Sequence, residues 1–181
     1  MKNVILLHGT GDSPKLFWFP EIAKQLMKKG FLVWAPQLPN AMKPSLKDWL
    51  PFVLENGKFS RGTILIGHSA GAQLILSLLE NIPVKVKQAI LVSGYAESLP
   101  EISGAKNRRK FLWGKIRKHA GNFVFINSDN DPWGCNDKQG RIMLNRLGGT
   151  LIIPRGEGHM GSTTYKQPYK KFPLLLSFVL T

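Results

Sequence analysis

Thr63-Ile64-Leu65-Ile66-Gly67-His68-Ser69-Ala70-Gly71 joins a wholly apolar run to a second apolar segment that continues to Glu80. The last five of these residues match G-x-S-x-G, a motif that needs a strand before it and a helix after it. Small residues at both flanks let a helix and a strand approach closely. The stretch therefore predicts a strand over 63–67, a sharp turn at Ser69 and a helix over 70–80, with the serine hydroxyl raised above the end of the strand.

The same alternation of strand and helix continues in both directions. Apolar runs predict further strands, and periodic apolar positions predict helices, the second of which has Ser45 as its N-cap. The expected strands are 4–7, 31–35, 63–67, 88–93, 123–127 and 150–153, and the expected helices are 15–29, 45–55, 70–80, 137–147 and 170–180. Strands that are apolar throughout require cover on both faces. The pattern predicts a three-layer α/β/α sandwich with a mostly parallel sheet of about six strands.

Length and composition limit the remaining possibilities. The 181 residues suit a single domain, 1–181, with 43% hydrophobic residues to build its core. No apolar run reaches the roughly 20 residues of a membrane span, and Val4–Leu7 is too short for a signal sequence. The only cysteine, Cys135, excludes an internal disulfide framework and an all-cysteine zinc site. We expect a cytoplasmic protein with no metal and no cofactor.

The net charge of +14 is the unusual feature of the composition. It favours contact with nucleic acid, anionic lipid or an anionic substrate. Seven of the basic residues lie between 106 and 118, interleaved with Phe111 and Trp113: Lys106, Arg108, Arg109, Lys110, Lys115, Arg117 and Lys118. This segment is interpreted either as an anionic docking surface near the mouth of a pocket or as an ordinary solvated helix face.

A nucleophilic serine needs a base and a carboxylate that orients the base. Two candidate acids, Asp129 and Asp131, follow the strand expected at 123–127. Asp131 is favoured because Pro132 biases it towards an extended conformation, whereas Asp129 could cap the loop through an Asx turn. The carboxyl ends of parallel strands meet at one edge of the sheet, so either aspartate would lie near Ser69.

Among the four histidines, His159 is the expected base. It follows the last expected strand in a glycine-rich loop, downstream of both candidate acids. His8 and His68 lie beside glycines in turns, where an imidazole more often braces a loop, and His119 lies in the basic segment and is expected to be solvated.

His8-Gly9-Thr10-Gly11 follows the first expected strand and is similar to the H-G-x-G type of oxyanion loop. The backbone N–H groups of Thr10 and Ala70 are the candidate oxyanion donors, and a plain glycine turn is the alternative. Trp18, Phe19 and Trp133 either line an acyl or alcohol pocket or pack in the core or at its rim.

These motifs together resemble the YdeN-like and retinoblastoma-binding-protein type of small serine hydrolase, a branch of the α/β-hydrolase superfamily. The resemblance covers nearly the whole chain, and it rests on motifs that follow in the same order: His8-Gly9, Trp18-Phe19-Pro20, Pro39, Pro44, Asp48-Trp49, Gly67–Gly71, Ser93-Gly94-Tyr95, Asp129–Pro132 and Gly158-His159. It implies hydrolysis through an acyl-enzyme, with Ser69 as nucleophile, His159 as base and the acid immediately before the proline, Asp131. Ala70 departs from the pattern, since the family often has Leu there.

The chain has little room for a lid. Only residues 94–122 are available for an insertion, enough for one or two helices, so we expect a minimal α/β-hydrolase fold without a cap domain and an open site that takes small acyl groups. Ester hydrolysis is the leading hypothesis for function. The alternatives are an amidase or peptidase with the same three residues, and a binding protein of hydrolase fold that uses segment 106–118 to hold an anionic partner.

Overall fold

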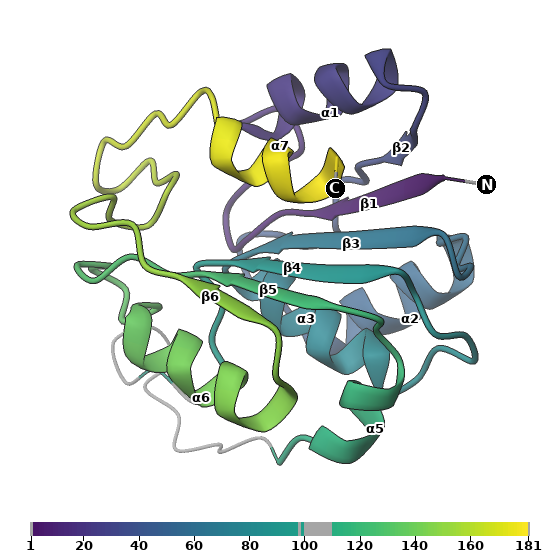
Figure 1. The fold of residues 1–181 in the computed structure, drawn as a ribbon. Coiled ribbons are helices and arrows are strands. Elements are labelled where there is room, and N and C mark those ends of the chain that lie inside the picture. Colours follow the sequence, from purple (N-terminus) through teal and green to yellow (C-terminus); the bar gives the residue numbers. More distant parts are fainter. Residues whose placement is uncertain (1, 98, 100–109, 181) are drawn as a thin grey trace.

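The computed structural model describes residues 2–97, 99 and 110–180, and these form a parallel sheet between two layers of helices (Figure 1). All strands run in the same direction, in the order β2-β1-β3-β4-β5-β6. Their bounds are β1 (Asn3–Leu7), β2 (Leu32–Trp34), β3 (Thr63–His68), β4 (Gln88–Val92), β5 (Phe123–Ile126) and β6 (Thr150–Ile152). The predicted six-stranded parallel sheet is confirmed.

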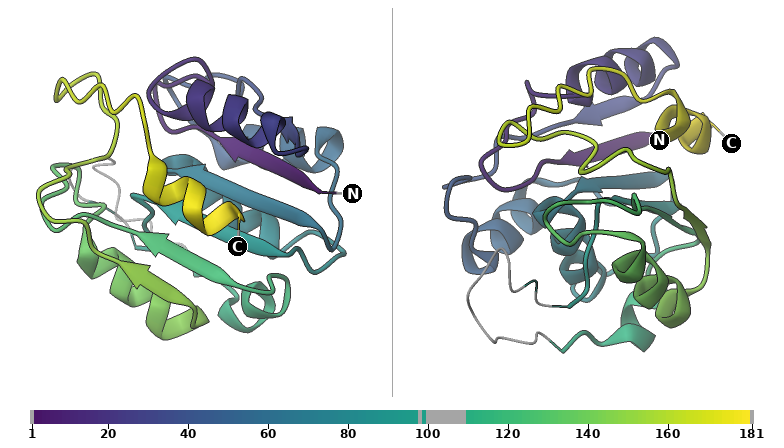
Figure 2. Two further views of the ribbon diagram at one scale, coloured as in Figure 1. Left: turned by 45° about the horizontal axis from the view of Figure 1, so that its top comes forward. Right: turned by 90° about the vertical axis from the view of Figure 1, so that its left-hand side faces the viewer.

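Helices cover both faces, as the apolar strands require. Their bounds are α1 (Phe19–Lys28), α2 (Leu46–Asn56), α3 (Ala70–Leu79), α5 (Trp113–Lys118), α6 (Asp137–Leu147) and α7 (Pro173–Leu180). Helices α1 and α7 lie on one face of the sheet, and α2, α3, α5 and α6 lie on the other (Figure 2). Each layer encloses its own apolar cluster against the sheet, one around Phe19 and Leu175 and the other around Leu74 and Phe125. The central strands β3 and β4 are buried on both faces.

Most predicted boundaries agree with the structure, and two helices begin later than expected. Helix α1 starts at Phe19 instead of residue 15, because the chain turns over residues 14–18 and Pro20 suits the first turn of a helix. Helix α7 starts at Pro173 instead of residue 170, since a proline disfavours helical backbone in the residue before it. Ser45 caps α2 as predicted, and its Oγ accepts the N–H of Lys47 at 3.2 Å.

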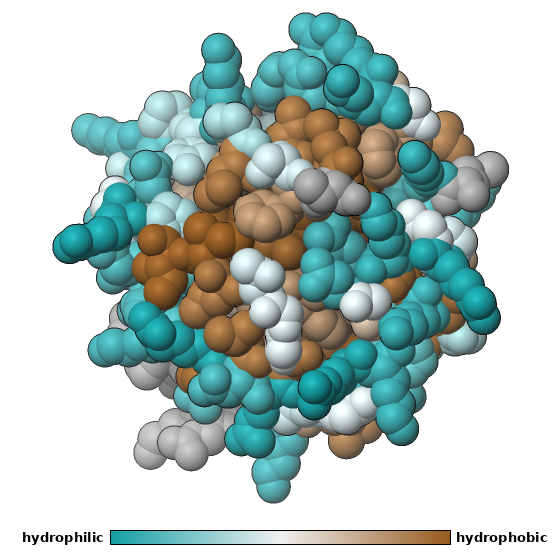
Figure 3. Space-filling view, viewed as in Figure 1, coloured by the Kyte–Doolittle hydropathy of each residue, from teal (hydrophilic) through white to brown (hydrophobic). Residues whose placement is uncertain are grey.

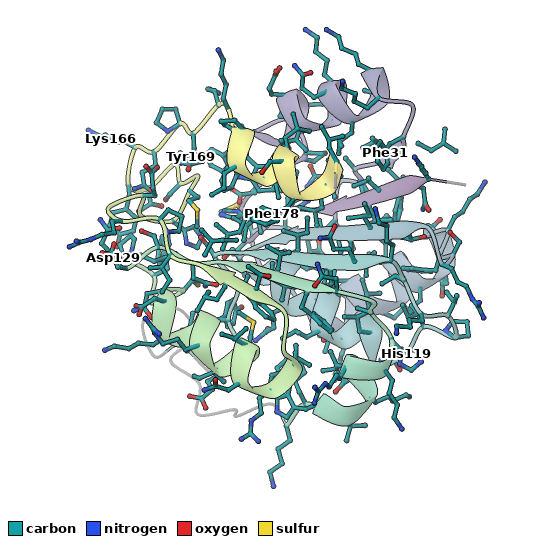
Figure 4. The ribbon with its side chains drawn as sticks, in the orientation of Figure 1. Phe31, His119, Asp129, Lys166, Tyr169 and Phe178 are labelled. Atoms are coloured by element: carbon teal, nitrogen blue, oxygen red, sulfur yellow. The ribbon has the colours of Figure 1, made fainter. Side chains whose placement is uncertain are left out.

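The direction of the strands gives the molecule two distinct edges. We call the side where the strands begin the amino edge and the side where they end the carboxyl edge. In Figure 4, Phe31 and His119 mark the amino edge, and Asp129 and Lys166 mark the carboxyl edge. No helix among the described residues has the length and hydrophobicity to cross a bilayer.

Candidate active site

Ser69 lies in a sharp turn between β3 and α3. Its backbone has φ 54° and ψ −119°, a strained left-handed conformation for a residue with a side chain, and its N–H donates to the carbonyl of Val92 at 2.9 Å. The two glycines of the motif permit this turn. A Cβ on Gly67 would lie 2.5 Å from the carbonyl oxygen of Gly71, and a Cβ on Gly71 would collide with the carbonyls of Leu7 and His8. The motif thus has the strand–turn–helix context that it requires.

His159 and Asp131 form a buried pair beside this turn. The Nδ1–H of His159 donates to Oδ2 of Asp131 at 2.7 Å, and both residues are almost wholly buried. The other carboxylate oxygen, Oδ1, accepts the N–H of Trp133 at 2.9 Å, which fixes the carboxylate on its turn. With Nδ1 protonated and held, the ring presents Nε2 as its acceptor.

Asp129, the alternative acid, has a different partner. Its Oδ1 accepts the N–H of Gly156 at 2.8 Å, and Oδ2 lies 3.5 Å from Nε of Arg155. The hydrogen bond from Gly156, together with Arg155, holds the pKa of Asp129 below its usual value. Asp129 therefore ties the loop after β5 to the loop after β6 and does not contact His159.

Two neighbours of Asp129 extend this connection between the loops. Oγ of Ser128 accepts the N–H of Glu157 at 3.0 Å, and Oδ1 of Asn130 accepts the N–H of Gly158 at 2.8 Å. Three successive residues after β5 thus receive three successive amides of the loop that leads to His159. Asn130 Oδ1 also accepts from Ser128 Oγ at 2.8 Å, so the acceptors hold one another in place.

The backbone of His159 is fixed at both its ends. Its N–H donates to Oε1 of Gln167 at 2.9 Å, and its carbonyl accepts Nε2–H of His68 at 2.8 Å and Oγ–H of Ser93 at 3.0 Å. His68 is fully buried, and its Nδ1 has no hydrogen-bond partner in the described part of the chain; Oδ2 of Asp12 lies 3.7 Å away. The histidine of the motif therefore supports the loop that carries His159.

Burial also tunes the His159 ring. Desolvation lowers the pKa of His159 below the ordinary histidine value of 6.5, and the hydrogen bond to Asp131 opposes this shift without cancelling it. The ring of His68, 4.7 Å away between centroids, lowers the pKa of His159 further. His159 is consequently neutral at pH 7 and able to accept a proton at Nε2.

His8 braces the loop after β1. Its Nδ1–H donates to the carbonyl of Gly9 at 2.9 Å, and its Nε2 accepts the N–H of Leu38 at 2.9 Å. Burial lowers the pKa of His8, which favours this neutral form. Along the loop, the N–H of Gly11 donates to Ala41 at 2.8 Å. The amides of Thr10 and Ala70 make no hydrogen bond to any residue that the structure describes, so both are available as donors.

Ser69 and His159 share a hollow of about 410 Å³ at the carboxyl edge. Its remaining wall residues are Thr10, Gly11, Asp12, Met42, Trp133, Gly161, Ser162, Thr163 and Thr164. No hydrogen bond joins Ser69 Oγ to His159 in the described residues, and catalytic hydrogen bonds are often long or poorly aligned before a substrate binds. Asp12, Met42 and the 161–164 stretch were missed in the sequence, although each follows a strand at this edge, which is the one available signal.

The two candidate pocket tryptophans occupy different places. Trp133 lines the hollow, with its ring 6.4 Å from that of His159 and 5.1 Å from that of Tyr165. Trp18 is fully buried in the core, where it stacks on Phe19, and its Nε1–H donates to the carbonyl of Met160 at 3.0 Å. A pocket role for Trp18 is therefore wrong: the indole packs beneath the site and holds the residue after His159.

The described part of the basic segment lies away from the mouth of the hollow. Residues 106–109 lie outside the described residues, and the rest of the segment runs through α5 to the start of β5. Leu112 N–H donates to Oε1 of Glu80 just after the end of α3, and Val86 N–H donates to the carbonyl of His119 just before β4. Residues 112–119 consequently lie at the amino edge, across the sheet from Ser69 (Figure 4).

Three side chains that could bind a metal ion include both members of the His159–Asp131 pair. Ligand atoms of Asp131, Cys135 and His159 lie within 4.8 Å of one another, and all three residues are buried. The Nδ1–H of His159 already donates to Asp131, so a metal ion here would have to displace that proton. The chemistry of the set fits the hydrogen-bonded pair better than a metal.

This sheet, this turn and this pair of residues define the α/β-hydrolase class. A family model described as serine hydrolase matches residues 4–177, and the chain belongs to that family. It is 36% identical to the hydrolase YdeN of Bacillus subtilis over 104 residues, 56% of this chain and 55% of YdeN. It is 28% identical to the serine hydrolase RBBP9 of Rattus norvegicus over 164 residues, 88% of this chain and 87% of RBBP9.

Solved structures share the fold. The structure of the Bacillus subtilis ydeN gene product superposes with a TM-score of 0.89 at 26% identity, over 99% of this chain and 97% of that chain. Est1E of Butyrivibrio proteoclasticus superposes with a TM-score of 0.66 at 15% identity, over 98% of this chain and 85% of its own, which shows the fold alone. The family that the sequence motifs resemble is thus confirmed.

Proposed function

We propose that the chain is a single-domain serine hydrolase that cleaves a carboxylic ester through an acyl-enzyme. Ser69 is the nucleophile, His159 the base and Asp131 the residue that orients the base. The observation that carries this proposal is the 2.7 Å hydrogen bond from His159 Nδ1 to Asp131 at the wall of the hollow that contains Ser69. The strained turn at Ser69 and membership of the serine hydrolase family support the same roles.

The reaction follows from the protonation states. Oγ of Ser69 attacks the ester carbonyl while Nε2 of His159 takes the hydroxyl proton, and Asp131 stabilises the imidazolium that forms. The negative charge that develops on the carbonyl oxygen is held by the amides of Thr10 and Ala70. The tetrahedral intermediate then expels the alcohol, which receives the proton from Nε2. A water molecule repeats these steps on the acyl-enzyme, and the acid leaves with Ser69 restored.

The hollow favours a small acyl group. Its walls combine the apolar Met42 and Trp133 with the hydroxyls of Thr10, Ser162 and Thr164. At about 410 Å³ the hollow lies towards the lower end of the range for small-molecule sites, roughly 300–1,000 Å³. Short-chain esters should therefore fit better than long acyl chains.

Activity-based labelling tests the proposal. The protein should hydrolyse p-nitrophenyl acetate and react with a fluorophosphonate probe, and Ser69→Ala should abolish both. Ser162→Ala is the matched control, because it removes a hydroxyl from the same hollow and should retain labelling. A protein that folds but neither hydrolyses nor labels would contradict the enzyme assignment. A parallel panel of anilides separates esterase from amidase activity, since the same three residues serve both.

A further inference from the structure

The amino edge carries a dense group of exposed cations. We call Lys2, Lys58, Arg61, Lys85, Lys87 and Lys118 the basic patch. Each lies in the segment that leads into a strand: Lys2 precedes β1, Lys58 and Arg61 precede β3, Lys85 and Lys87 precede β4, and Lys118 precedes β5. These strands are adjacent in the sheet, so the parallel topology brings the six side chains to one surface.

Hydrogen bonds join these segments into one continuous surface. Asn3 Nδ2–H donates to the carbonyl of Lys58 at 2.8 Å, and Lys87 N–H donates to the carbonyl of Thr63 at 2.9 Å. Val86 also pairs with Ala120 in an isolated bridge, which places the end of α5 next to the start of β4. The patch is therefore held in shape by the sheet and is not a set of independent flexible loops.

The acidic residues do not neutralise this patch. Asp12, Asp129, Asp131 and Glu157 all follow strands, at the carboxyl edge. At the amino edge, Glu55 is exposed near the end of α2, and Glu80 is buried with Oε1 accepting the N–H of Leu112. None of the six patch cations forms an ion pair with another described residue. In Figure 3, hydrophilic side chains project along the right-hand rim, which is the amino edge in that view, and along the left-hand rim as well.

The patch contains a hollow lined by three of its cations. Arg61, Lys85 and Lys87 line a depression of about 490 Å³, together with Pro83, Val84, Val86 and Gly121. Three cations around one concavity suit a phosphate or phosphoserine group, because an arginine offers paired donors and the lysines add point charges.

Exposed aliphatic residues at the same edge favour a membrane over a nucleic acid. Leu32 is 58% exposed, and its N–H donates to the carbonyl of Lys2 at 3.0 Å; Met27 is 56% exposed near the end of α1, beside Lys28. Single-stranded nucleic acids are bound on exposed aromatic rings, and none of the large exposed hydrophobic residues described at this edge is aromatic. Aliphatic side chains next to lysines instead suit the boundary between headgroups and acyl chains.

We propose that the amino edge docks on an anionic lipid surface, with headgroups held by Arg61, Lys85 and Lys87 and with Met27 and Leu32 entering the interface. The hollow with Ser69 lies at the opposite edge, so docking leaves it facing water. This surface role is independent of the esterase proposal, and the two can fail separately.

Vesicle sedimentation with the full chain tests the docking. The protein should pellet with phosphatidylcholine vesicles that contain phosphatidylserine, should not pellet with phosphatidylcholine alone, and should be released by high salt. The variant R61Q/K85Q/K87Q should lose about 100-fold in partitioning, since each basic residue near a charged membrane is worth roughly fivefold. The control K47Q/K166Q/K170Q removes the same charge from the carboxyl edge and should lose less than about fivefold.

A second pair of variants keeps the test informative. Met27→Ser and Leu32→Ser leave the charge unchanged and should weaken vesicle binding. The effect should be largest at intermediate salt, because salt screens the charges and apolar contacts then supply a larger share of the binding free energy. Circular dichroism checks that every variant is folded. The proposal is overturned if vesicles that contain phosphatidylserine are not bound, or if the two triple variants lose binding equally. It is also overturned if single-stranded RNA competes fully with the vesicles while Met27→Ser and Leu32→Ser bind vesicles as the parent protein does.

The orientation gives a further readout, which rests on the proposed esterase activity. Hydrolysis of a water-soluble ester should be unchanged when the protein is bound to vesicles, because the hollow faces away from them. The proposed orientation is overturned if bound vesicles strongly inhibit ester hydrolysis and free lipid does not inhibit it.

Discussion

The Nε2–H of His68 donates to the backbone carbonyl of His159 at 2.8 Å, so the residue before the proposed nucleophile holds the residue proposed as the base. Ser93, at the end of the neighbouring strand β4, donates to the same carbonyl at 3.0 Å. Strand β3, which leads into the turn at Ser69, and its neighbour β4 thus both hold the loop that carries His159. The position of the His159 ring depends on these donors as well as on Asp131.

We expect His68 to act as a positioning residue. His68→Leu leaves the carbonyl of His159 with Ser93 as its one side-chain donor among the described residues, and we expect kcat to fall about tenfold to 100-fold while KM stays within about twofold, because misplacement of a reacting group costs rate. His68→Gln keeps a donor of similar reach and should recover much of that loss. If the two variants lose kcat equally, the hydrogen bond has no positioning role.

Asp131→Asn and Asp129→Asn should have opposite consequences. The first removes the carboxylate that receives His159 Nδ1–H, and we expect kcat to fall about 10⁴-fold, the cost of leaving a histidine in the wrong tautomer. The second weakens the bond to the N–H of Gly156 and should lower stability only slightly, with kcat within about threefold. Steady-state kinetics and urea unfolding of both variants check this. A large loss of kcat in Asp129→Asn alone would reverse the assignment.

Sequence reasoning worked where chemistry and local backbone coincide. The G-x-S-x-G spacing requires a strand–turn–helix unit wherever it occurs, and a proline after Asp131 restricts that residue locally. Contacts between distant segments have no such motif in the sequence. The side chain of Gln167 accepts the N–H of His159, and the indole of Trp18 donates to the carbonyl of Met160, and both contacts depend on how the loops close. The sequence left Trp18 undecided between pocket and core for this reason, since a large aromatic side chain suits both equally well.

The location of the basic segment shows the same limit. Its composition indicates charge, but only the topology shows that α5 ends where β5 begins, at the amino edge. A charge count along the sequence also hides the contribution of Lys2, Lys58 and Lys87, which are far apart in the chain and adjacent in the sheet.

The pH dependence of hydrolysis should reflect the lowered pKa of His159. Burial lowers that pKa below 6.5, so the neutral, active form persists to lower pH, and the acid limb of kcat/KM should have its midpoint below 6.5. The hydrogen bond to Asp131 raises the pKa of His159, so Asp131→Asn should shift the acid limb to still lower pH and should also reduce the plateau value of kcat/KM. A pH–rate profile of both proteins measures these shifts. A parent midpoint above 6.5 is inconsistent with the buried environment described.

Stability should fall on acidification for a related reason. His8 and His159 have folded-state pKa values below the unfolded value of 6.5, so below 6.5 the unfolded chain binds more protons than the folded one. The stabilisation is fully present above 6.5 and is lost as the pH falls through the folded pKa values. Urea unfolding at about pH 7.5 and about pH 5.5 should show this loss. His8→Gln should be less stable at both values but show a smaller difference between them.

Trp18→Phe and Trp133→Phe should separate a core tryptophan from a pocket tryptophan. Trp18→Phe removes the Nε1–H that holds the carbonyl of Met160 and leaves space in the core, so we expect a loss of about 2–4 kcal/mol in unfolding free energy. Trp133 lines the hollow at intermediate exposure, and Trp133→Phe should change KM for short esters while stability stays within about 1 kcal/mol. Because Met160 follows His159, Trp18→Phe should also lower kcat with KM little changed. A change confined to KM in Trp18→Phe would place its indole at the substrate, which a fully buried side chain cannot reach.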